Sequence, residues 1–170
     1  MTNKRRHSWD SPNAWEQAKP SMWCVSIILL SNMLLFVGSL ASAADSEKHL
    51  LFGMSTALKG PAAELGVNMR AGILAAFHRV NKEGGIDGRS LRLISLNDGY
   101  EPSQTAPNMR RLIERDQVLA VVGNVGTPTA IAAIPIANKE RTLFFAPFTG
   151  AGVLRKSPPD RYVINYRASY

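Results

Sequence analysis

Short apolar runs alternate along this chain with longer amphipathic segments, and the alternation restricts the fold more than any other feature. Between the first two runs, Met69, Ile73, Ala76, Phe77 and Val80 recur at helical spacing, which predicts a helix with one buried face. The runs that predict strands are 50–55, 91–96, 118–122, 143–146 and, more weakly, 161–166. This order predicts an α/β fold: a doubly wound parallel sheet with right-handed crossovers and helices on both faces.

The stretch "NKEGGIDGRSLRLISLNDG" at 81–99 contains the residues that predict where the elements of one crossover begin and end. Gly84 and Gly85 supply the positive φ angles with which helices end, and Asp87-Gly88 is a tight-turn dipeptide. The run from Leu91 to Leu96 alternates apolar side chains on both faces, as a strand covered on both sides requires. The stretch therefore predicts helix end, turn, buried strand and a second turn.

The first 43 residues are typical of a secretory signal and are set apart from the fold. A basic start, an apolar run over 23–40 and the small-x-small pattern Ala41-Ser42-Ala43 predict cleavage after Ala43 and a periplasmic location. An uncleaved membrane anchor is the alternative, because the region before the apolar run is long. The mature domain is then 44–170.

Composition limits the classes of partner. Residues 44–170 carry 16 Lys and Arg against 11 Asp and Glu, a net charge of +5, but these charges are scattered and indicate a solvated face. No basic run is interleaved with aromatic residues, so nucleic-acid binding is not expected. The single cysteine, Cys24, lies before the mature domain, which therefore has no disulfide.

Ligands of doubly wound sheets bind at the carboxyl ends of the strands, where the strand order reverses. For the order 2-1-3-4, the loops that meet there are 57–65 and 123–129, and the loop 147–152 adjoins them. All three are rich in glycine, threonine and small residues. The start of the third helix, near Thr127 and Pro128, adds free N–H groups that favour a carboxylate.

Each of these features also has a purely structural interpretation. Thr127 before Pro128 is a good helix N-cap, and Thr149-Gly150 can be a plain turn. A lone carboxylate such as Asp98 usually caps a turn. His49 and His78 lack metal-ligand spacing and are expected to face solvent, so neither a metal nor a cofactor is expected. No nucleophile, base and orienting acid can be assembled, which argues against an enzyme.

The segments "LLFGMSTALKGPAAELG", "GILAAFHRVNKEGGIDGRSLRLISLNDGYEP", "VLAVVGNVGTPT" and "LFFAPFTGAGVLR" resemble the type I periplasmic substrate-binding proteins of ABC transporters, in the branched-chain amino acid (leucine-binding protein-like) group. The resemblance covers essentially the whole of 44–170. It implies two α/β lobes that close on a small ligand, an ABC transporter permease as partner, and no catalytic residues.

The resemblance also implies ligand-binding residues in the first lobe: Leu65, Gly126, Thr127, Phe148, Thr149 and Gly150. Leu65 lacks the aromatic ring that many relatives carry at its position. Gly150 stands where some relatives have a threonine, for which Thr149 could substitute. The ligand therefore stays open between an amino acid and a small polar amide-type molecule.

Family members continue for a second lobe, so 44–170 is interpreted as a partial amino-terminal lobe and the chain as a fragment with the second lobe missing. The leading functional hypothesis is an extracytoplasmic solute-binding protein of an ABC importer. The alternative is a ligand-sensing domain of a receptor or regulator with the same fold.

Overall fold

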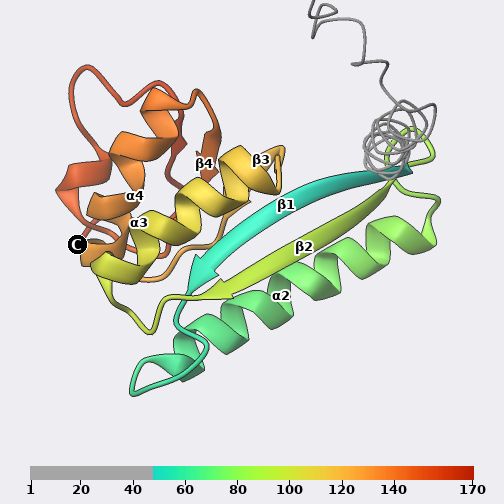
Figure 1. Ribbon diagram of the computed structural model, residues 1–170, viewed down its shortest axis with the longest axis horizontal. Coiled ribbons are helices and arrows are strands. Elements are labelled where there is room, and N and C mark those ends of the chain that lie inside the picture. The colour runs from blue at the N-terminus through green and yellow to red at the C-terminus, as the bar shows by residue number, and fades with distance from the viewer. Residues whose placement is uncertain (1–47) are drawn as a thin grey trace, which may run out of the picture. The chain divides into compact units, whose positions relative to one another are not determined.

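The computed structural model describes residues 48–170, which form a parallel sheet with helices on both of its faces (Figure 1). The expected signal segment, 1–43, and its cleavage point after Ala43 lie outside the described residues. The sheet has five strands in the order β2-β1-β3-β4-β5, and every neighbouring pair is parallel. The order 2-1-3-4, which is the condition for placing the strand-end loops together, is the order observed, and the weak fifth run contributes one more strand.

The first crossover runs from β1 (His49–Thr56) through α2 (Ala63–Lys82) to β2 (Ser90–Asn97). Gly84 and Gly85 have φ angles of 98° and 78°, and they end the helix as predicted. Asp87 and Gly88 also have positive φ angles, and mutual backbone bonds of 2.9 Å between Ile86 and Arg89 close a two-residue turn.

The rest of the chain adds three strands to the other edge of β1. The elements are α3 (Pro102–Arg110), the π-helical turn η1 (Arg111–Arg115), β3 (Ala120–Val122), α4 (Thr127–Lys139), β4 (Leu143–Phe145), the 3-10 turn η2 (Gly152–Leu154) and β5 (Val163–Ile164). Pro135 lies inside α4, and the helix is continuous through it.

The two faces of the sheet are covered unequally. α3 and α4 pack on one face around Met109, Leu112, Ile134 and Phe144, all of them buried. On the other face, α2 is the one described helix that lies along β1 and β2 (Figure 1). Its predicted apolar stripe is only half-buried, and Ala76 is exposed, so the expected buried face of this helix is wrong at that residue.

Two sequence expectations fail for local reasons. Thr127 is the first residue of α4 and not its N-cap: Gly126, with φ 104° and ψ 152°, precedes the helix and accepts a bond from Ala130 N at 3.1 Å. His49 is half-buried and does not simply face solvent, because its Nδ1 lies 2.6 Å from the Ser90 hydroxyl across neighbouring strands.

Candidate functional site

The reversal of strand order lies between β1 and β3, and the loops that follow β3 and β4 are joined there. Val125 and Phe148 form an isolated parallel bridge beyond the ends of the two strands. The Phe148 amide donates to the Asn124 carbonyl at 2.6 Å, and the Gly126 amide lies 3.5 Å from the Phe148 carbonyl. These bonds hold Gly126, Thr127, Phe148, Thr149 and Gly150, five of the six predicted ligand-binding residues, in one region at the carboxyl edge of the sheet.

Two threonine hydroxyls form the polar centre of this region. Thr127 Oγ1 lies 2.6 Å from Thr149 Oγ1, and Thr149 is fully buried. Thr149 Oγ1 also accepts from the Ala151 amide at 3.2 Å. Because the Thr127 hydroxyl makes no cap bond to α4, the helix-cap interpretation of this residue is wrong, and the hydroxyl faces the loop after β4.

Gly126 is a glycine for two reasons that the structure makes plain. Its backbone, with φ 104° and ψ 152°, is nearly closed to other residues. A Cβ at this position would also lie 2.4 Å from Cε2 of Tyr100. Tyr100, which itself has a φ of 72°, therefore lies against the start of α4. Sequence reasoning did not select Tyr100, although it follows a strand-end Asn-Asp-Gly in the same set of loops.

Leu65 and Phe148 lie on an apolar groove beside α2. The groove has a volume of about 510 Å³, and its lining is Leu65, Asn68, Met69, Gly72, Ile73, Ala76 and Phe148. Leu65 is 49% exposed. The sixth predicted residue, Leu65, thus shares a groove with Phe148, one of the other five.

The segment that follows β5 folds back on Gly150. The Tyr170 amide donates to the Gly150 carbonyl at 3.2 Å, and the Tyr170 hydroxyl lies 3.4 Å from Thr149 Oγ1. A Cβ on Gly150 would lie 2.6 Å from the Ala168 carbonyl oxygen, which explains why glycine stands there. A hydrogen bond between the Tyr170 phenol and the Thr149 hydroxyl, followed by one between the phenol and the Gly150 backbone, lowers the pKa of this phenol below its usual value.

Arg167, in the same segment, completes the group of residues that sequence reasoning missed. Its guanidinium carbon lies 4.2 Å from the centroid of the Phe148 ring and 5.6 Å from that of Tyr170. Arg155 donates to the Arg167 carbonyl and so ties this segment to the chain just after η2. A return of the chain over 20 residues leaves no local sequence signal, so pattern reading could not find it.

Asp98 is structural, as expected. It is buried, accepts from the hydroxyls of Ser55 at 2.9 Å and Thr105 at 3.1 Å, and accepts from the Tyr100 amide at 3.0 Å. Its carboxylate therefore fastens the loop between β2 and α3 to the end of β1.

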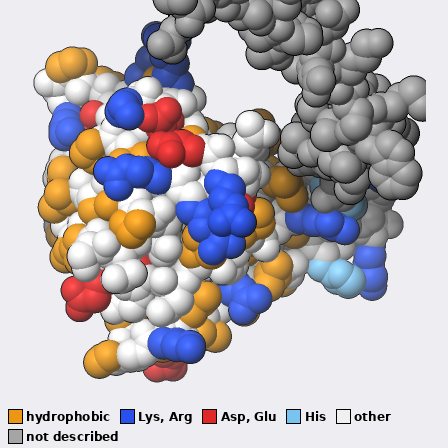
Figure 2. Space-filling view, in the orientation of Figure 1, with side chains coloured by type: hydrophobic (Ala, Val, Ile, Leu, Met, Phe, Trp, Pro, Cys, Tyr) orange, Lys and Arg blue, Asp and Glu red, His pale blue; other side chains and the backbone are white. Residues whose placement is uncertain are grey.

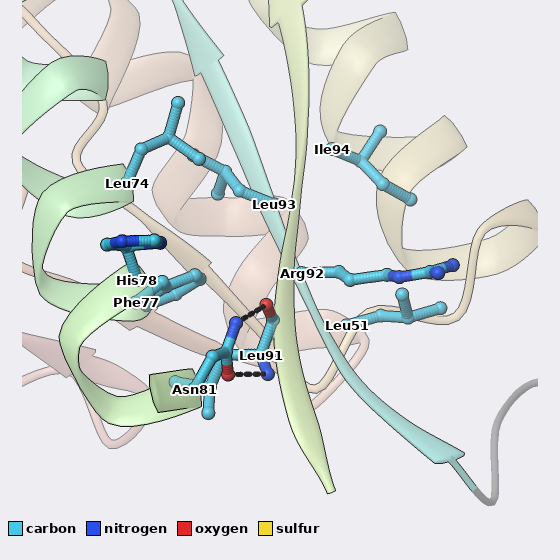
Figure 3. Close-up of a pocket in the computed structure, with 9 residues that line it drawn as sticks. All are labelled: Leu51, Leu74, Phe77, His78, Asn81, Leu91, Arg92, Leu93 and Ile94. Atoms are coloured by element: carbon cyan, nitrogen blue, oxygen red, sulfur yellow. Dashed lines mark hydrogen bonds between the residues drawn. The ribbon is translucent and has the colours of Figure 1, made fainter. Parts of the chain in front are cut away.

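A second hollow lies away from this site. Figure 3 shows it along the first half of β2, with the Asn81 side chain bonded to the backbone of Leu91. Its lining is Leu51, Leu74, Phe77, His78, Asn81, Leu91, Arg92, Leu93 and Ile94. Leu91 and Leu93 point toward α2 in this view and Ile94 points to the opposite face, which confirms the predicted alternation of apolar side chains along β2.

The surface and the described helices give little sign of other functions. Figure 2 shows Lys and Arg side chains dispersed among apolar and acidic ones on one face, and no continuous basic stripe there. Within residues 48–170, no helix has the length and apolarity that a membrane span needs. In the same range, no three His, Cys, Asp or Glu residues cluster in a way that could hold a metal ion.

The parallel sheet with helices on both faces defines the class of the fold: an α/β lobe of the doubly wound type. Residues 51–170 match the family described as "Periplasmic binding protein", and the chain belongs to that family. The family consists of binding proteins, so the expectation of a non-enzymatic chain is confirmed.

Two relatives carry names that describe amino-acid binding. The chain is 34% identical over 109 residues to the "Leucine-, isoleucine-, valine-, threonine-, and alanine-binding protein" of Pseudomonas aeruginosa, a match over 64% of this chain and 28% of the relative. It is 28% identical over 144 residues to "Leu/Ile/Val-binding protein homolog 7" of Brucella suis, over 84% of this chain and 34% of the relative. The chain thus spans about a third of the length of these relatives.

Solved structures agree with the fold. A possible leucine/isoleucine/valine-binding protein from Rhodopirellula baltica is 63% identical, with a TM-score of 0.68 over 72% of this chain and 32% of that one. LivJ from Streptococcus pneumoniae, solved with isoleucine, has a TM-score of 0.65 at 22% identity over 72% of this chain and 34% of that one, and supports the fold alone. The type I periplasmic-binding-protein fold expected from the sequence is confirmed over the part that the chain covers.

Proposed function

We propose that the protein is an extracytoplasmic solute-binding protein of an ABC importer, and that residues 44–170 supply part of its first lobe. The observation that carries the proposal is the pair of hydroxyls, Thr127 and Thr149, 2.6 Å apart at the reversal of strand order in a family of binding proteins. The ligand is an amino acid or a small polar amide-type molecule, which a second lobe would enclose. Export would use segment 1–43, with cleavage after Ala43.

The chemistry of the region supports a ligand of this kind. The start of α4 directs backbone N–H groups and the positive end of the helix dipole toward Thr127, an arrangement that favours a carboxylate. The groove lined by Leu65 and Phe148 is apolar and could accept an aliphatic side chain. The six ligand-binding residues are Leu65, Gly126, Thr127, Phe148, Thr149 and Gly150.

Calorimetry on the longest form of the protein that cells export tests this proposal, with a panel of amino acids and small polar amides. Thr127→Ala should weaken binding by about 1–3 kcal/mol, because it leaves a polar group of the ligand without a partner. Thr142→Ala is the matched control. Thr142 lies just before β4, at the opposite end of the strands, and its hydroxyl donates to the Glu140 carbonyl at 3.3 Å. The affinity of this variant for the ligand should equal that of the parent.

Two outcomes would contradict the proposal. If no member of the panel binds, the amino-acid and amide classes are wrong. If Thr127→Ala binds as tightly as the parent, Thr127 is not part of the site. Loss of ligand uptake on deletion of the gene would separate an importer from the alternative, a ligand-sensing domain, since a sensor that works without transport would leave uptake intact.

A further inference from the structure

The chain folds back after β5 and brings Arg167 next to the proposed site, although no sequence motif predicted a cation there. Arg167 is exposed, and its guanidinium stacks on Phe148, the residue next to Thr149. The same segment brings the Tyr170 hydroxyl to within 3.4 Å of Thr149 Oγ1. Arg167, Phe148, Thr149, Tyr170 and Thr127 therefore form one connected group, which we call the carboxyl-edge cluster.

The contact of a guanidinium with an aromatic face uses none of its hydrogen-bond donors. Its five N–H groups lie in the plane of the guanidinium, where they can still reach an acceptor. Within residues 48–170, Arg167 makes no ion pair, and its side chain donates no hydrogen bond to another described residue. Its donors are therefore available to a ligand.

The carboxyl-edge cluster also contains three hydroxyls. Those of Thr127 and Tyr170 converge on that of Thr149, and the adjoining start of α4 adds a positive dipole end. Among the described residues, no carboxylate side chain bonds to these hydroxyls or to Arg167. A set of hydroxyls with a permanent cation and no acidic side chain bonded to it is complementary to an anion.

We infer that Arg167 is a specificity-determining residue that binds the carboxylate of the ligand, so that the site selects amino acids over their neutral amides. This inference rests on the proposed function and deepens it, because it decides between the two ligand classes left open above. A bidentate guanidinium–carboxylate pair adds an attraction between opposite charges and two parallel hydrogen bonds to the hydroxyl contacts. A neutral amide has no charge and only one acceptor oxygen, so it cannot form this pair.

The experiment compares five amino acids with their own α-carboxamides on the longest exported form of the protein. The probes are alanine, threonine, valine, isoleucine and leucine, measured by calorimetry below neutral pH, where the α-amine of both forms is protonated. For any pair that binds, the acid should bind at least about tenfold more tightly than the amide, as expected for a hydrogen bond between charged partners. Arg167→Gln should lower this ratio severalfold and leave the affinity for the amide nearly unchanged, while the start of α4 keeps a residual preference for the acid.

Two further variants distinguish recognition of the carboxylate by Arg167 from the packing of an arginine on an aromatic ring. Arg167→Lys keeps the charge and should keep part of the preference for the acid. Arg161→Gln is the matched control, because Arg161 also lies over an aromatic ring, that of Tyr162 at 5.8 Å, but outside the cluster. Its ratio should equal that of the parent.

The outcomes distinguish the inference from the function beneath it. If the parent binds acid and amide equally well, or if Arg167→Gln weakens both to the same extent, the inference is wrong while solute binding stands. If the parent binds none of the ten probes, the proposed function fails for this class of ligand, and the role of Arg167 fails with it.

Discussion

At the scale of single residues, the addition of one methyl group at Gly126 should destabilise the fold strongly. In the longest exported form, Gly126→Ala should lower the free energy of unfolding by roughly 2–3 kcal/mol, since it forces an alanine into a glycine-only backbone region and drives its Cβ into the Tyr100 ring. Urea denaturation followed by circular dichroism measures the change.

Gly72→Ala is the natural comparison for that measurement. Gly72 is exposed inside α2, and no atom lies within 4 Å of the Cβ it would acquire. Alanine should therefore stabilise the helix there by about 0.5–1 kcal/mol. Equal effects at the two glycines would show that helix propensity, and not the geometry of Gly126, governs the response.

At the scale of elements, Asn81 joins the end of α2 to the start of β2. Its side chain donates to the Leu91 carbonyl at 2.9 Å and accepts from the Leu91 amide at 2.7 Å, as the dashed lines in Figure 3 show. Among residues 48–170, β2 is an edge strand, so these two bonds satisfy backbone groups that no described strand reaches.

Asn81→Ala should therefore destabilise the longest exported form by about 1–3 kcal/mol and speed hydrogen exchange at the Leu91 amide. Asn68→Ala, at an exposed position of the same helix, should change neither quantity measurably. If Leu91 keeps its protection in Asn81→Ala, the two side-chain bonds do not hold the strand.

The same elements show what the sequence could and could not predict. Local chemistry was enough for the turn at Asp87-Gly88 and for the end of α2, because glycine and turn residues act within a few positions. It was not enough for Thr127, whose place in the helix depends on the backbone of Gly126. It also could not find Arg167, which reaches Phe148 only through tertiary folding, or the exposure of Ala76, which depends on what packs against α2.

At the scale of the whole molecule, residues 48–170 leave apolar surface uncovered. Phe145 is 40% exposed and Ile164 49%, and Leu65 and Leu74 on α2 are exposed to a similar degree. Among the described residues, β2 and β5 each pair with one neighbour only, so both edges of the sheet are open. Open edges and apolar patches of this kind recruit other chains.

A protein consisting of residues 44–170 alone should therefore be marginally stable, should associate or aggregate, and should show no measurable affinity for amino acids. The hydrogen bonds between one lobe and a ligand would be exposed to water, where each contributes little free energy of binding. No second lobe would close over the ligand. Size-exclusion chromatography with light scattering and a thermal melt with and without leucine measure these properties. A monodisperse monomer whose cooperative melt rises with leucine would contradict the prediction, because it would show that the carboxyl-edge cluster binds its ligand without a second lobe.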